Sequence, residues 1–508
     1  MERIVLIVDI GTQSIRSMLI NQYGEIKAIE KRKYKYIVDD NFIEFDADEV
    51  FMTIVKELVS LHNKNIRDYG KIEGVSITSQ RDSFVVVDKR GKPLRNCISW
   101  MDRRKAKNYP SPSIFHKIAF KLTKMDNVAK SAMEETRFYW IEENEREIYE
   151  KTYKYLSLSA YINFRFTGKF KDSDASTVGH IPFNYKDRKW EEFFTVKGQL
   201  FQIEEKLLWR VVESTKPIGE IKEEICEALL LKKGTLIYAS GSDKTCETAG
   251  VGAIDEKTAS VSLGSQATLQ INSNKYYTLD RFVPPFCSVI PNHYNPEVIV
   301  YRGFWMIKWF IKNFAKEEEI YARAHEMSTE EVLNSKLGTI PAGSDGLVIH
   351  PYWGQEILRP NAKGSMIGFN DKHTRLHMYK AIIEGIFYAL KEGILKIEKK
   401  NNIKIEKIAL SAGGSRSDEI CQMAADVFGK KVYTVQTHEA TALGSAMAVF
   451  IGRGVYYDFF EAKNEMLSIK KEYTPIGENY TVYDGIYKNV YSKVYPSLKN
   501  IYDKKGKK

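Results

Sequence analysis

Residues 4–16 read IVLIVDIGTQSIR, the pattern of two strands joined by a tight bend. Ile4 to Val8 is a run of apolar, mostly β-branched residues, which is typical of a buried strand. The run ends on Asp9, and a second apolar run covers residues 15–20. A Gly-Thr-Gln-Ser bend between two strands points several backbone N–H groups at one place. Such a bend is a good cradle for a phosphate.

Asp9 is the acidic residue of this bend. A carboxylate repels a phosphate, but it can hold Mg²⁺ beside one, directly or through water. Arg16 is placed to reach back to the same phosphate oxygens. We therefore predict Asp9 as the metal-binding residue. The alternative is an ordinary hairpin in which the Asp and Gly residues only form the turn.

Length and composition indicate a large protein without extracellular or membrane features. A chain of 508 residues predicts two or three domains. The five cysteines are scattered and lack a CxxC pair, which argues against a disulfide framework or a zinc site and favours a reducing compartment. No window approaches the length of about 20 apolar residues that a membrane span needs. We expect a cytoplasmic protein.

The formal net charge of +10 is spread as lysines over the whole length. The dense run at residues 504–508 is interpreted as a solvated chain end rather than as a tail for nucleic acid or membranes. A mild positive excess suits anionic ligands such as nucleotides. We expect a small-molecule substrate and neither a nucleic-acid nor a membrane partner, and we leave a homodimer open.

The second half of the chain repeats the layout of the first in two places. ASVSLGSQATLQI at 259–271 again predicts strand, Gly-Ser-Gln and strand, with Ser262 where the first half has Asp9. KIEKIALSAGG at 404–414 mirrors KIEGVSITSQ at 71–80. Two echoes in the same order predict two related α/β halves with a cleft between them.

Two glycine-containing loops of the second half are candidates for nucleotide binding. The amides of Gly264 and Ser265 are expected to face the terminal phosphates from the side opposite the first bend. Gly413 and Gly414 follow a predicted strand, where backbone can approach a flat ligand such as adenine. The alternative for this pair is a tight turn before a helix.

Asp243 follows a predicted strand and Gly241, and it opens a predicted helix. One interpretation is a helix-capping carboxylate, which is a common use of Asp at such a place. The other is a general base that takes the proton of an attacking hydroxyl. Phosphoryl transfer has a loose transition state, so a weak base in the right position suffices. Alone the pattern favours the cap; together with the phosphate clusters it favours the base.

A third set of residues is suited to a polyol. Arg81 and Asp82 offer a donor fork beside an acceptor, which matches neighbouring hydroxyl groups. Trp100 is expected to add an apolar wall. The alternative is a surface ion-pair cluster.

These clusters, in this order, resemble the FGGY carbohydrate kinases of the actin-like ATPase superfamily. The resemblance covers residues 4 to about 452. The matching motifs are DIGTQSIR at 9–16, SQRDS at 79–83, GKPLRNCISWMDRR at 91–104, GSD at 241–243, GSQ at 264–266, AGGSRSDEICQMAADVFGKKV at 412–432 and EATALGSAMA at 439–448.

The resemblance implies two actin-like (ribonuclease H-like) domains with ATP and Mg²⁺ in the cleft between them. We place the domains at residues 1–254 and 255–508, the second with a C-terminal helical tail. The implied reaction transfers the γ-phosphate of ATP to an alcohol group of a sugar or polyol. By motif match, Asp243 is the catalytic base and Arg81 and Asp82 contact the substrate. The residues implied as phosphate contacts are Thr12, Gln13, Ser14 and Arg16.

Departures from the family pattern leave the substrate open among small polyols, ketoses and related acids. Xylulokinases carry Met-His at the positions of Arg81 and Asp82, which argues against D-xylulose as the substrate. Glycerol kinases carry Arg-Glu there. The substrate tyrosine of glycerol kinases is Ala132 here. The Gln after their catalytic Asp is Lys244, whose charge beside the site suits an acidic group or a phosphate oxygen. Glycerol itself is one alternative acceptor. A non-catalytic ATP-binding switch is an alternative of another class. Arg81, Asp82 and Trp100 argue against it, because a switch needs no pocket for a polyol.

Overall fold

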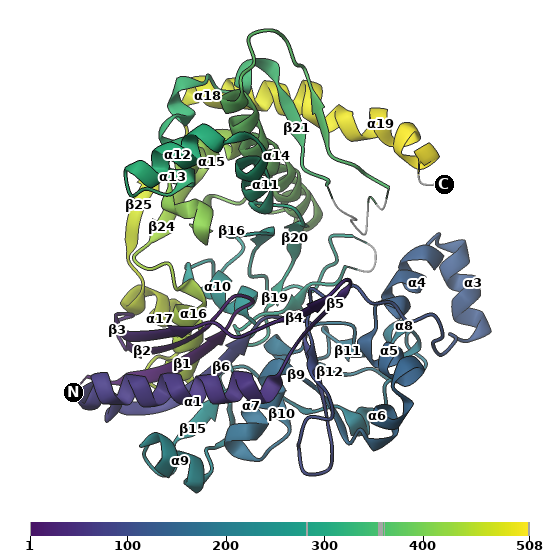
Figure 1. Cartoon of the computed structure of the whole chain (residues 1–508), viewed down its shortest axis with the longest axis vertical. Helices are drawn as coiled ribbons and strands as arrows, with labels where there is room; N and C mark the ends of the chain where they lie inside the picture. Colours follow the sequence, from purple (N-terminus) through teal and green to yellow (C-terminus); the bar gives the residue numbers. More distant parts are fainter. Residues whose placement is uncertain (1, 281–282, 354–358, 360, 506–508) are drawn as a thin grey trace.

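Two α/β lobes, each built on a six-stranded sheet, make up the protein in the computed structural model, which describes residues 2–280, 283–353, 359 and 361–505 (Figure 1). The first sheet has the order β14-β15-β6-β1-β2-β3, with the bounds Pro217–Glu220, Leu236–Tyr238, Ile72–Ser79, Ile4–Ile10, Ile15–Asn21 and Ile26–Arg32. The second has the order β20-β17-β16-β23-β24-β25, with the bounds Glu297–Val300, Ala267–Gln270, Thr258–Leu263, Lys407–Ser411, Lys431–Val435 and Ile469–Tyr473.

The remaining elements surround these sheets. A five-stranded sheet of the first lobe has the order β4-β5-β8-β7-β9, with the bounds Ile37–Asp39, Phe42–Phe45, Cys97–Ile98, Phe84–Val87 and Lys154–Ser157. Four strand pairs are β10–β13 (Lys171–Ser173 and Arg210–Val212), β11–β12 (Phe183–Asn184 and Lys189–Trp190), β18–β19 (Phe286–Cys287 and Tyr294–Asn295) and β21–β22 (Val348–His350 and Ser365–Ile367).

The helices are distributed over both lobes. In the first half of the chain they are α1 (Ala47–Lys64), α2 (Ile66–Tyr69), α3 (Ile114–Leu122), α4 (Asp126–Glu134), α5 (Arg137–Asn144), α6 (Arg146–Lys151), α7 (Leu158–Thr167), α8 (Val196–Leu200), α9 (Glu223–Leu229) and α10 (Asp243–Gly250). In the second half they are α11 (Trp305–Phe314), α12 (Lys316–Ala324), α13 (Thr329–Ser335), α14 (Arg375–Asn401), α15 (Asp418–Phe428), α16 (Ala440–Gly452), α17 (Phe459–Met466), α18 (Gly477–Ile486) and α19 (Ser492–Lys505). Within the described residues, no helix combines the length and the apolar composition that a bilayer crossing requires.

The two large sheets have the same topology. In the first, β1 is antiparallel to β2 and parallel to β6; in the second, β16 is antiparallel to β17 and parallel to β23. The outer strands also correspond. On one side, β3 is antiparallel to β2 in the first sheet, and β20 is antiparallel to β17 in the second. On the other side, parallel β15 and β24 are followed by antiparallel β14 and β25. This correspondence confirms the predicted α/β fold of two related halves.

Strand β1 is buried on both faces because helices cover both sides of the first sheet. Leu6 and Val8 belong to the same core as Ile54 of α1. Val5 and Ile7 belong to another core together with α16, which comes from the second half of the chain. Side chains alternate between the faces of a strand, so Asp9 points to the same side as Val5 and Ile7.

Helices α10 and α16 pack against each other in unusually close contact. A Cβ atom on Gly444 would lie 1.9 Å from the carbonyl oxygen of Cys246, and one on Gly250 would lie 1.9 Å from that of Ala440. Only glycine permits this approach, and it brings the start of α10 beside the start of α16. Figure 1 shows α16 and α17 lying beside the strands of the lower lobe, although they come from the second half of the chain.

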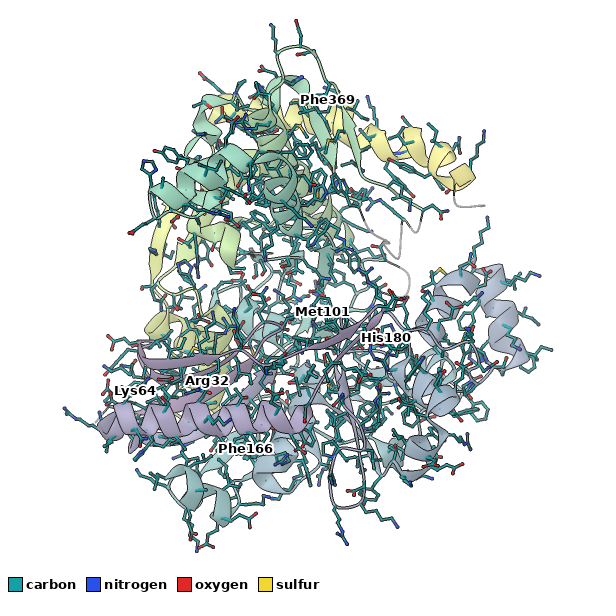
Figure 2. All side chains as sticks on the ribbon, viewed as in Figure 1. Arg32, Lys64, Met101, Phe166, His180 and Phe369 are labelled. Carbon is teal, nitrogen blue, oxygen red and sulfur yellow. The ribbon has the colours of Figure 1, made fainter. Side chains whose placement is uncertain are left out.

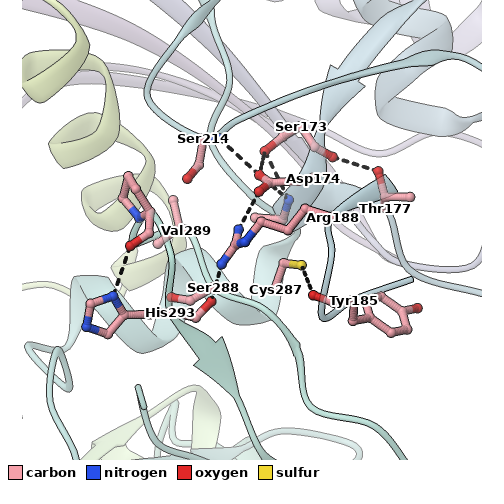
Figure 3. Close-up of polar contacts among 12 residues, drawn as sticks. Ser173, Asp174, Thr177, Tyr185, Arg188, Ser214, Cys287, Ser288, Val289 and His293 are labelled. Carbon is pink, nitrogen blue, oxygen red and sulfur yellow. Dashed lines mark hydrogen bonds and ion pairs between the residues drawn. The ribbon is translucent and has the colours of Figure 1, made fainter. Parts of the chain in front are cut away.

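A further segment of the second half also packs on the first lobe. Between β17 and β20 the chain leaves the second sheet and forms the β18–β19 hairpin. Arg188 of the first lobe forms an ion pair with Asp174 and donates to the carbonyl oxygen of His293 at 2.6 Å (Figure 3). Cys287 Sγ donates to the carbonyl oxygen of Tyr185 at 3.3 Å. The domain division at residues 254 and 255 remains a prediction. Segments after residue 255 in the sequence pack on the first lobe as well as on the second.

We predict that Gly444→Ala lowers the stability of the protein. The new methyl group meets a backbone carbonyl that no side-chain rotation can move, and overpacking of this kind costs about 1–3 kcal/mol. Gly485→Ala is the matched control, because it also lies in a helix but its Cβ position has no atom within 4 Å. The control should gain up to about 1 kcal/mol from helix propensity. Urea unfolding of both variants tests this, and equal midpoints would contradict the close packing of α10 and α16.

Candidate active site

Asp9 and Asp243 lie at the same edge of the first sheet. Asp9 pairs with Thr78 across the parallel strands β1 and β6. The Thr78 hydroxyl donates to the carbonyl oxygen of Gly241 at 2.8 Å, two residues before Asp243. The carboxyl ends of parallel strands meet at one edge of a sheet, where open α/β folds bind their ligands. The fold thus brings together an acid from the start of the chain and one from its middle.

Asp9 is fully buried and has one oxygen without a partner. Its Oδ2 accepts from the Arg16 guanidinium, while Oδ1 has no hydrogen-bond partner in the described part of the chain. Burial raises the pKa of Asp9 to about 6 against the effect of Arg16, and the charges of Asp243, Glu439 and Glu247 raise it further. An open carboxylate oxygen within an excess of negative charge fits a bound cation.

The surroundings of Asp9 fit Mg²⁺ rather than a metal held by protein alone. Among the described residues, no group of three or more His, Cys, Asp or Glu side chains is arranged to hold a metal ion. Mg²⁺ in phosphate-transfer sites is usually held by one or two carboxylates, by water and by the phosphates of the substrate. A single open carboxylate is therefore compatible with the predicted role of Asp9.

The first bend is joined to both lobes. Arg16 lies between Asp9 and Glu439, with Nη1 at 2.5 Å from Glu439 Oε2, and Glu439 immediately precedes α16. Thr12 Oγ1 accepts from the Trp100 indole N–H at 3.1 Å. The side chain of Gln13 is exposed, and Ser14 is buried, with its carbonyl oxygen accepting from the Gly11 amide at 3.1 Å. Gln13 is thus the most accessible of the predicted phosphate contacts.

Gly264 and Ser265 form the corresponding bend of the second sheet. The carbonyl oxygen of Gly264 accepts from the Phe304 amide at 3.0 Å, and that of Ser265 accepts from the Trp305 amide at 3.2 Å. These bonds fix the two carbonyls against the start of α11. Ser265 is exposed and Gly264 is half-buried, so the bend remains accessible from outside.

The Gly413-Gly414 loop follows β23, which is parallel to β16 and ends at the same edge. A Cβ atom on Gly414 would lie 2.6 Å from the Phe304 ring, so this glycine is required for packing. A Cβ atom on Gly413 would have no atom within 4 Å, so this glycine faces open space. The two predicted nucleotide loops therefore touch each other through Phe304 and leave Gly413 free to meet a ligand.

Ala412, which precedes this loop, was not predicted as a site residue. It has φ of +65° and ψ of −165°, a conformation that residues other than glycine rarely adopt. Such strain costs about 1–3 kcal/mol and is concentrated at ligand sites. The sequence carries no signal for it, because Ala before Gly-Gly is compatible with any loop.

Asp243 begins α10 but does not act as its cap. The N-cap position belongs to Ser242, which makes no side-chain cap bond. Asp243 Oδ1 accepts from the adjacent Lys244 amide at 2.9 Å, and in the described chain Asp243 forms no ion pair. Burial raises the pKa of Asp243 against the opposing effects of Lys244 and Arg81. A half-buried carboxyl with a raised pKa and a free oxygen is suited to accept a proton.

Arg81 and Asp82 both have internal partners. Arg81 forms two hydrogen bonds with Glu297 of β20, at 2.9 and 2.7 Å, and thereby links the two lobes. Asp82 forms an ion pair with Arg137 at 3.0 Å and accepts from the backbone amide of His180 at 3.1 Å. Burial opposes the ionised form of Asp82, but Arg137 and His180 hold its pKa below the usual value. Figure 2 shows His180 near the border between the lobes.

Glu297, Arg137 and His180 are site residues that sequence reasoning missed. Each lies far along the chain from the residue it contacts, and each stands in a stretch without a recognisable motif. No local pattern identifies them. Only the approach of β20 and the segment around residue 180 to the Arg81–Asp82 loop makes them neighbours.

Lys244 is neutralised by a buried network between the lobes. Its Nζ donates to Glu247 Oε2 at 2.7 Å and to Ser262 Oγ at 2.9 Å. The other oxygen of Glu247 accepts from Ser262 and from Ser411, at 2.8 and 2.6 Å. Ser262, which replaces Asp9 in the second half, thus supports the charge pair. The indole N–H of Trp100 also reaches Gln80 at 3.1 Å, so Trp100 lies between the first bend and the Arg81–Asp82 loop.

Comparison with known proteins was made with this geometry in hand. Models of the N-terminal and C-terminal domains of the FGGY family of carbohydrate kinases match residues 4–250 and 259–452. The chain belongs to the FGGY family of carbohydrate kinases. The match confirms the predicted family, and the FGGY fold agrees with the two duplicated sheets.

Individual FGGY relatives are similar over nearly the whole chain. A xylulose kinase of Lactococcus lactis is 26% identical over 505 residues, which cover 98% of this chain and 97% of the relative. A gluconokinase of Bacillus subtilis is 25% identical over 486 residues, covering 93% and 92%. The structure of a ligand-bound xylulose kinase from Lactobacillus acidophilus has a TM-score of 0.83 at 23% identity, covering 99% of both chains.

We predict that Asp9→Asn changes the pH dependence of stability. The pKa of Asp9 is about 6 in the folded protein and about 3.9 in an unfolded chain. The folded state therefore binds the proton more tightly, and ionisation of Asp9 removes stability as pH rises between these values. Asn cannot ionise, so the stability of the variant relative to the parent protein should increase over this window by up to about 3 kcal/mol.

Urea unfolding at a series of pH values in magnesium-free buffer measures this difference. Asp371→Asn is the control, because Asp371 is an exposed carboxyl and should leave the pH profile unchanged. Parallel profiles for Asp9→Asn and the parent protein would show that Asp9 titrates normally in the folded state.

Proposed function

We propose that the protein is an ATP-dependent carbohydrate kinase that transfers the γ-phosphate of ATP to a hydroxyl group of a small sugar, ketose or polyol. The observation that carries the proposal is the meeting of Asp9 and Asp243 at one sheet edge, linked through Thr78 and Gly241. Membership of a family of carbohydrate kinases and the similarity to xylulose kinase and gluconokinase support it.

The proposed roles follow from the contacts of each residue. The bend before Arg16 holds the phosphates from the first lobe, and the loops at Gly264 and Gly413 hold the nucleotide from the second. Asp9 would hold Mg²⁺, which supplies positive charge to the transferring phosphoryl group when bound. The acceptor hydroxyl oxygen forms the new bond to phosphorus as the bond to ADP breaks. Asp243 receives the hydroxyl proton late in this step.

The compensated charges around Asp243 favour a neutral acceptor. Arg81 is paired with Glu297, and Lys244 is paired with Glu247. Neither cation is available to an acidic substrate without losing its internal partner, which is costly for a buried charge. We therefore favour a ketose or polyol over an acid as the substrate. Glycerol remains the alternative acceptor, since the resemblance to glycerol kinases includes the arginine at position 81.

A non-catalytic ATP-binding switch is the alternative of a different class. A switch needs the nucleotide loops but no base facing a polyol pocket. The oxygen of Asp243 that has no partner in the described part of the chain, with Trp100 and the Arg81–Asp82 loop as predicted substrate contacts, favours the kinase.

We predict that Asp243→Asn lowers turnover by about 10²–10⁴-fold, the usual effect of losing a general base. ADP release is measured with a panel of sugars and polyols, and the variant is tested on whichever substrate the parent protein accepts. Asp371→Asn serves as the control and should retain full activity, because this carboxyl is exposed.

Near-normal turnover of Asp243→Asn would refute the role of Asp243 as the base. ATP binding by the parent protein without ADP release on any substrate of the panel would favour the switch.

We predict that the parent protein prefers neutral ketoses and polyols to D-gluconate. Glu297→Gln should raise kcat/KM for gluconate relative to the best neutral acceptor by about 10–100-fold, because the positive charge of Arg81 is then uncompensated and can pair with a carboxylate. Glu472→Gln, which removes an exposed carboxylate, is the control and should leave this ratio unchanged. A parent protein that prefers gluconate would contradict the neutral acceptor.

A further inference from the structure

A pocket of about 600 Å³ lies in the first lobe, and none of its lining residues belongs to the proposed active site. It is formed by the start of β9, the β11–β12 hairpin, the short turn Glu205–Leu207 and strand β13. Its volume is in the usual range for sites that bind small molecules. A single acidic side chain, that of Glu205, lines it together with five basic ones: Lys154, Arg188, Lys189, Lys206 and Arg210.

Hydrogen bonds fix the walls of this pocket. Lys154 Nζ donates to the carbonyl oxygens of Lys206 and Leu208, at 2.6 and 2.8 Å, and so holds the turn against β9. The indole N–H of Trp190 donates to the carbonyl oxygen of Trp209 at 3.0 Å, which joins the hairpin to the residue before β13. Walls held in this way need little rearrangement when a ligand binds, which favours affinity.

Most of the positive charge in the pocket has no internal compensation. Lys189 and Arg210 are exposed, and within the described residues their side chains form no hydrogen bond or ion pair. Lys206 pairs with the exposed Glu204 at 2.7 Å, and surface pairs of this kind contribute little. Burial lowers the pKa of Lys154, whose ammonium group donates to backbone carbonyls rather than to a carboxylate. An anion in the pocket would therefore reduce the repulsion among these groups.

The floor of the pocket is apolar. Trp190, Leu208, Trp209 and Val211 complete its lining, and the two indole rings meet edge to face with centroids 5.0 Å apart. A bare inorganic anion would use the basic rim but leave this apolar surface in contact with water. A phosphate ester of a small organic molecule uses both, because the phosphate accepts charge-assisted hydrogen bonds while the carbon part covers apolar surface.

We propose that this pocket, which we call the β12–β13 pocket, is a second ligand site of the protein and binds a small organic phosphate of the sugar phosphate class. The basic rim binds the phosphate group, and the apolar floor receives the carbon part. The site is separate from the edge that carries Asp9 and Asp243. The proposal does not depend on the proposed kinase activity.

Lys189 and Arg210 are the side chains to change in a test of this site. Arg188 also lines the pocket, but it forms an ion pair with Asp174 and donates to the carbonyl oxygen of His293, so its loss would disturb the contact with the second half of the chain (Figure 3). Lys154 holds a wall of the pocket. Lys189 and Arg210 have no such internal contacts, so reversing their charges should leave the fold intact.

Isothermal titration calorimetry with glucose 6-phosphate, inorganic phosphate and glucose tests the proposal. The parent protein should bind glucose 6-phosphate with a Kd below about 1 mM. It should bind inorganic phosphate at least about tenfold more weakly, because the apolar floor then stays uncovered, and it should not bind glucose. Lys189→Glu/Arg210→Glu should weaken the binding of glucose 6-phosphate by about tenfold or more, since charge-assisted hydrogen bonds are lost.

Arg67→Glu/Lys399→Glu is the matched control. It makes the same change in net charge at two exposed positions outside the pocket, where the side chains form no hydrogen bond or ion pair within the described chain. This control should bind glucose 6-phosphate like the parent protein, and circular dichroism checks that both variants are folded.

Four results would overturn the β12–β13 pocket as a sugar phosphate site. The first is a parent protein that does not bind glucose 6-phosphate in this range. The second is unchanged binding in Lys189→Glu/Arg210→Glu, which would place the ligand elsewhere, such as in the active site. The third is an equal loss of binding in the control variant, which would indicate a general effect of net charge. The fourth is equal affinity for inorganic phosphate, which would leave the apolar floor without a role.

Discussion

Arg16 is the charge on which the junction of the two lobes depends. It lies between Asp9 at the end of the first strand and Glu439 at the start of α16, so one guanidinium neutralises carboxylates from both halves of the chain. Even so, burial raises the pKa of Asp9, and the charges of Asp243, Glu439 and Glu247 raise it further. The junction thus retains an excess of negative charge. A site with this negative potential attracts a divalent cation, which can in turn bind a phosphate.

Pairs of opposite charges also hold the rest of the site together. Arg81 meets Glu297 across the boundary between the sheets, and Lys244 meets Glu247 within α10. Ser262 and Ser411 of the second sheet donate to the other oxygen of Glu247. Removing one member of such a buried pair leaves an uncompensated charge, which costs more than the pair itself contributes. These pairs therefore position the loops around Asp243 more than they add to overall stability. Within the described residues they also leave one oxygen of Asp243, like Oδ1 of Asp9, without a hydrogen-bond partner.

Close helix packing supplies the frame that holds these charges in place. Gly250 and Gly444 let α10 and α16 approach until backbone meets backbone. Thr441 at the start of α16 donates to the carbonyl oxygen of Asp243 at 3.3 Å, so the two helices begin side by side. Because α16 and the β18–β19 hairpin come from the second half but pack on the first lobe, the chain crosses the boundary more than once.

Local sequence patterns were sufficient for the strands, the bends and the duplicated order of elements. The apolar run ending in Asp-Ile-Gly-Thr predicts the strand and turn that β1 and β2 form, and its echo at residues 259–271 predicts the β16–β17 pair of the second sheet. Asp9 could be proposed because it stands at the end of a strand, and Asp243 because it follows a strand and opens a helix. The partners of Arg81, Asp82 and Lys244, and the strained backbone of Ala412, depend on which distant segments approach one another. Pairing of buried charges is set by distances of a few ångströms between residues remote in sequence, and only the folded chain fixes those distances.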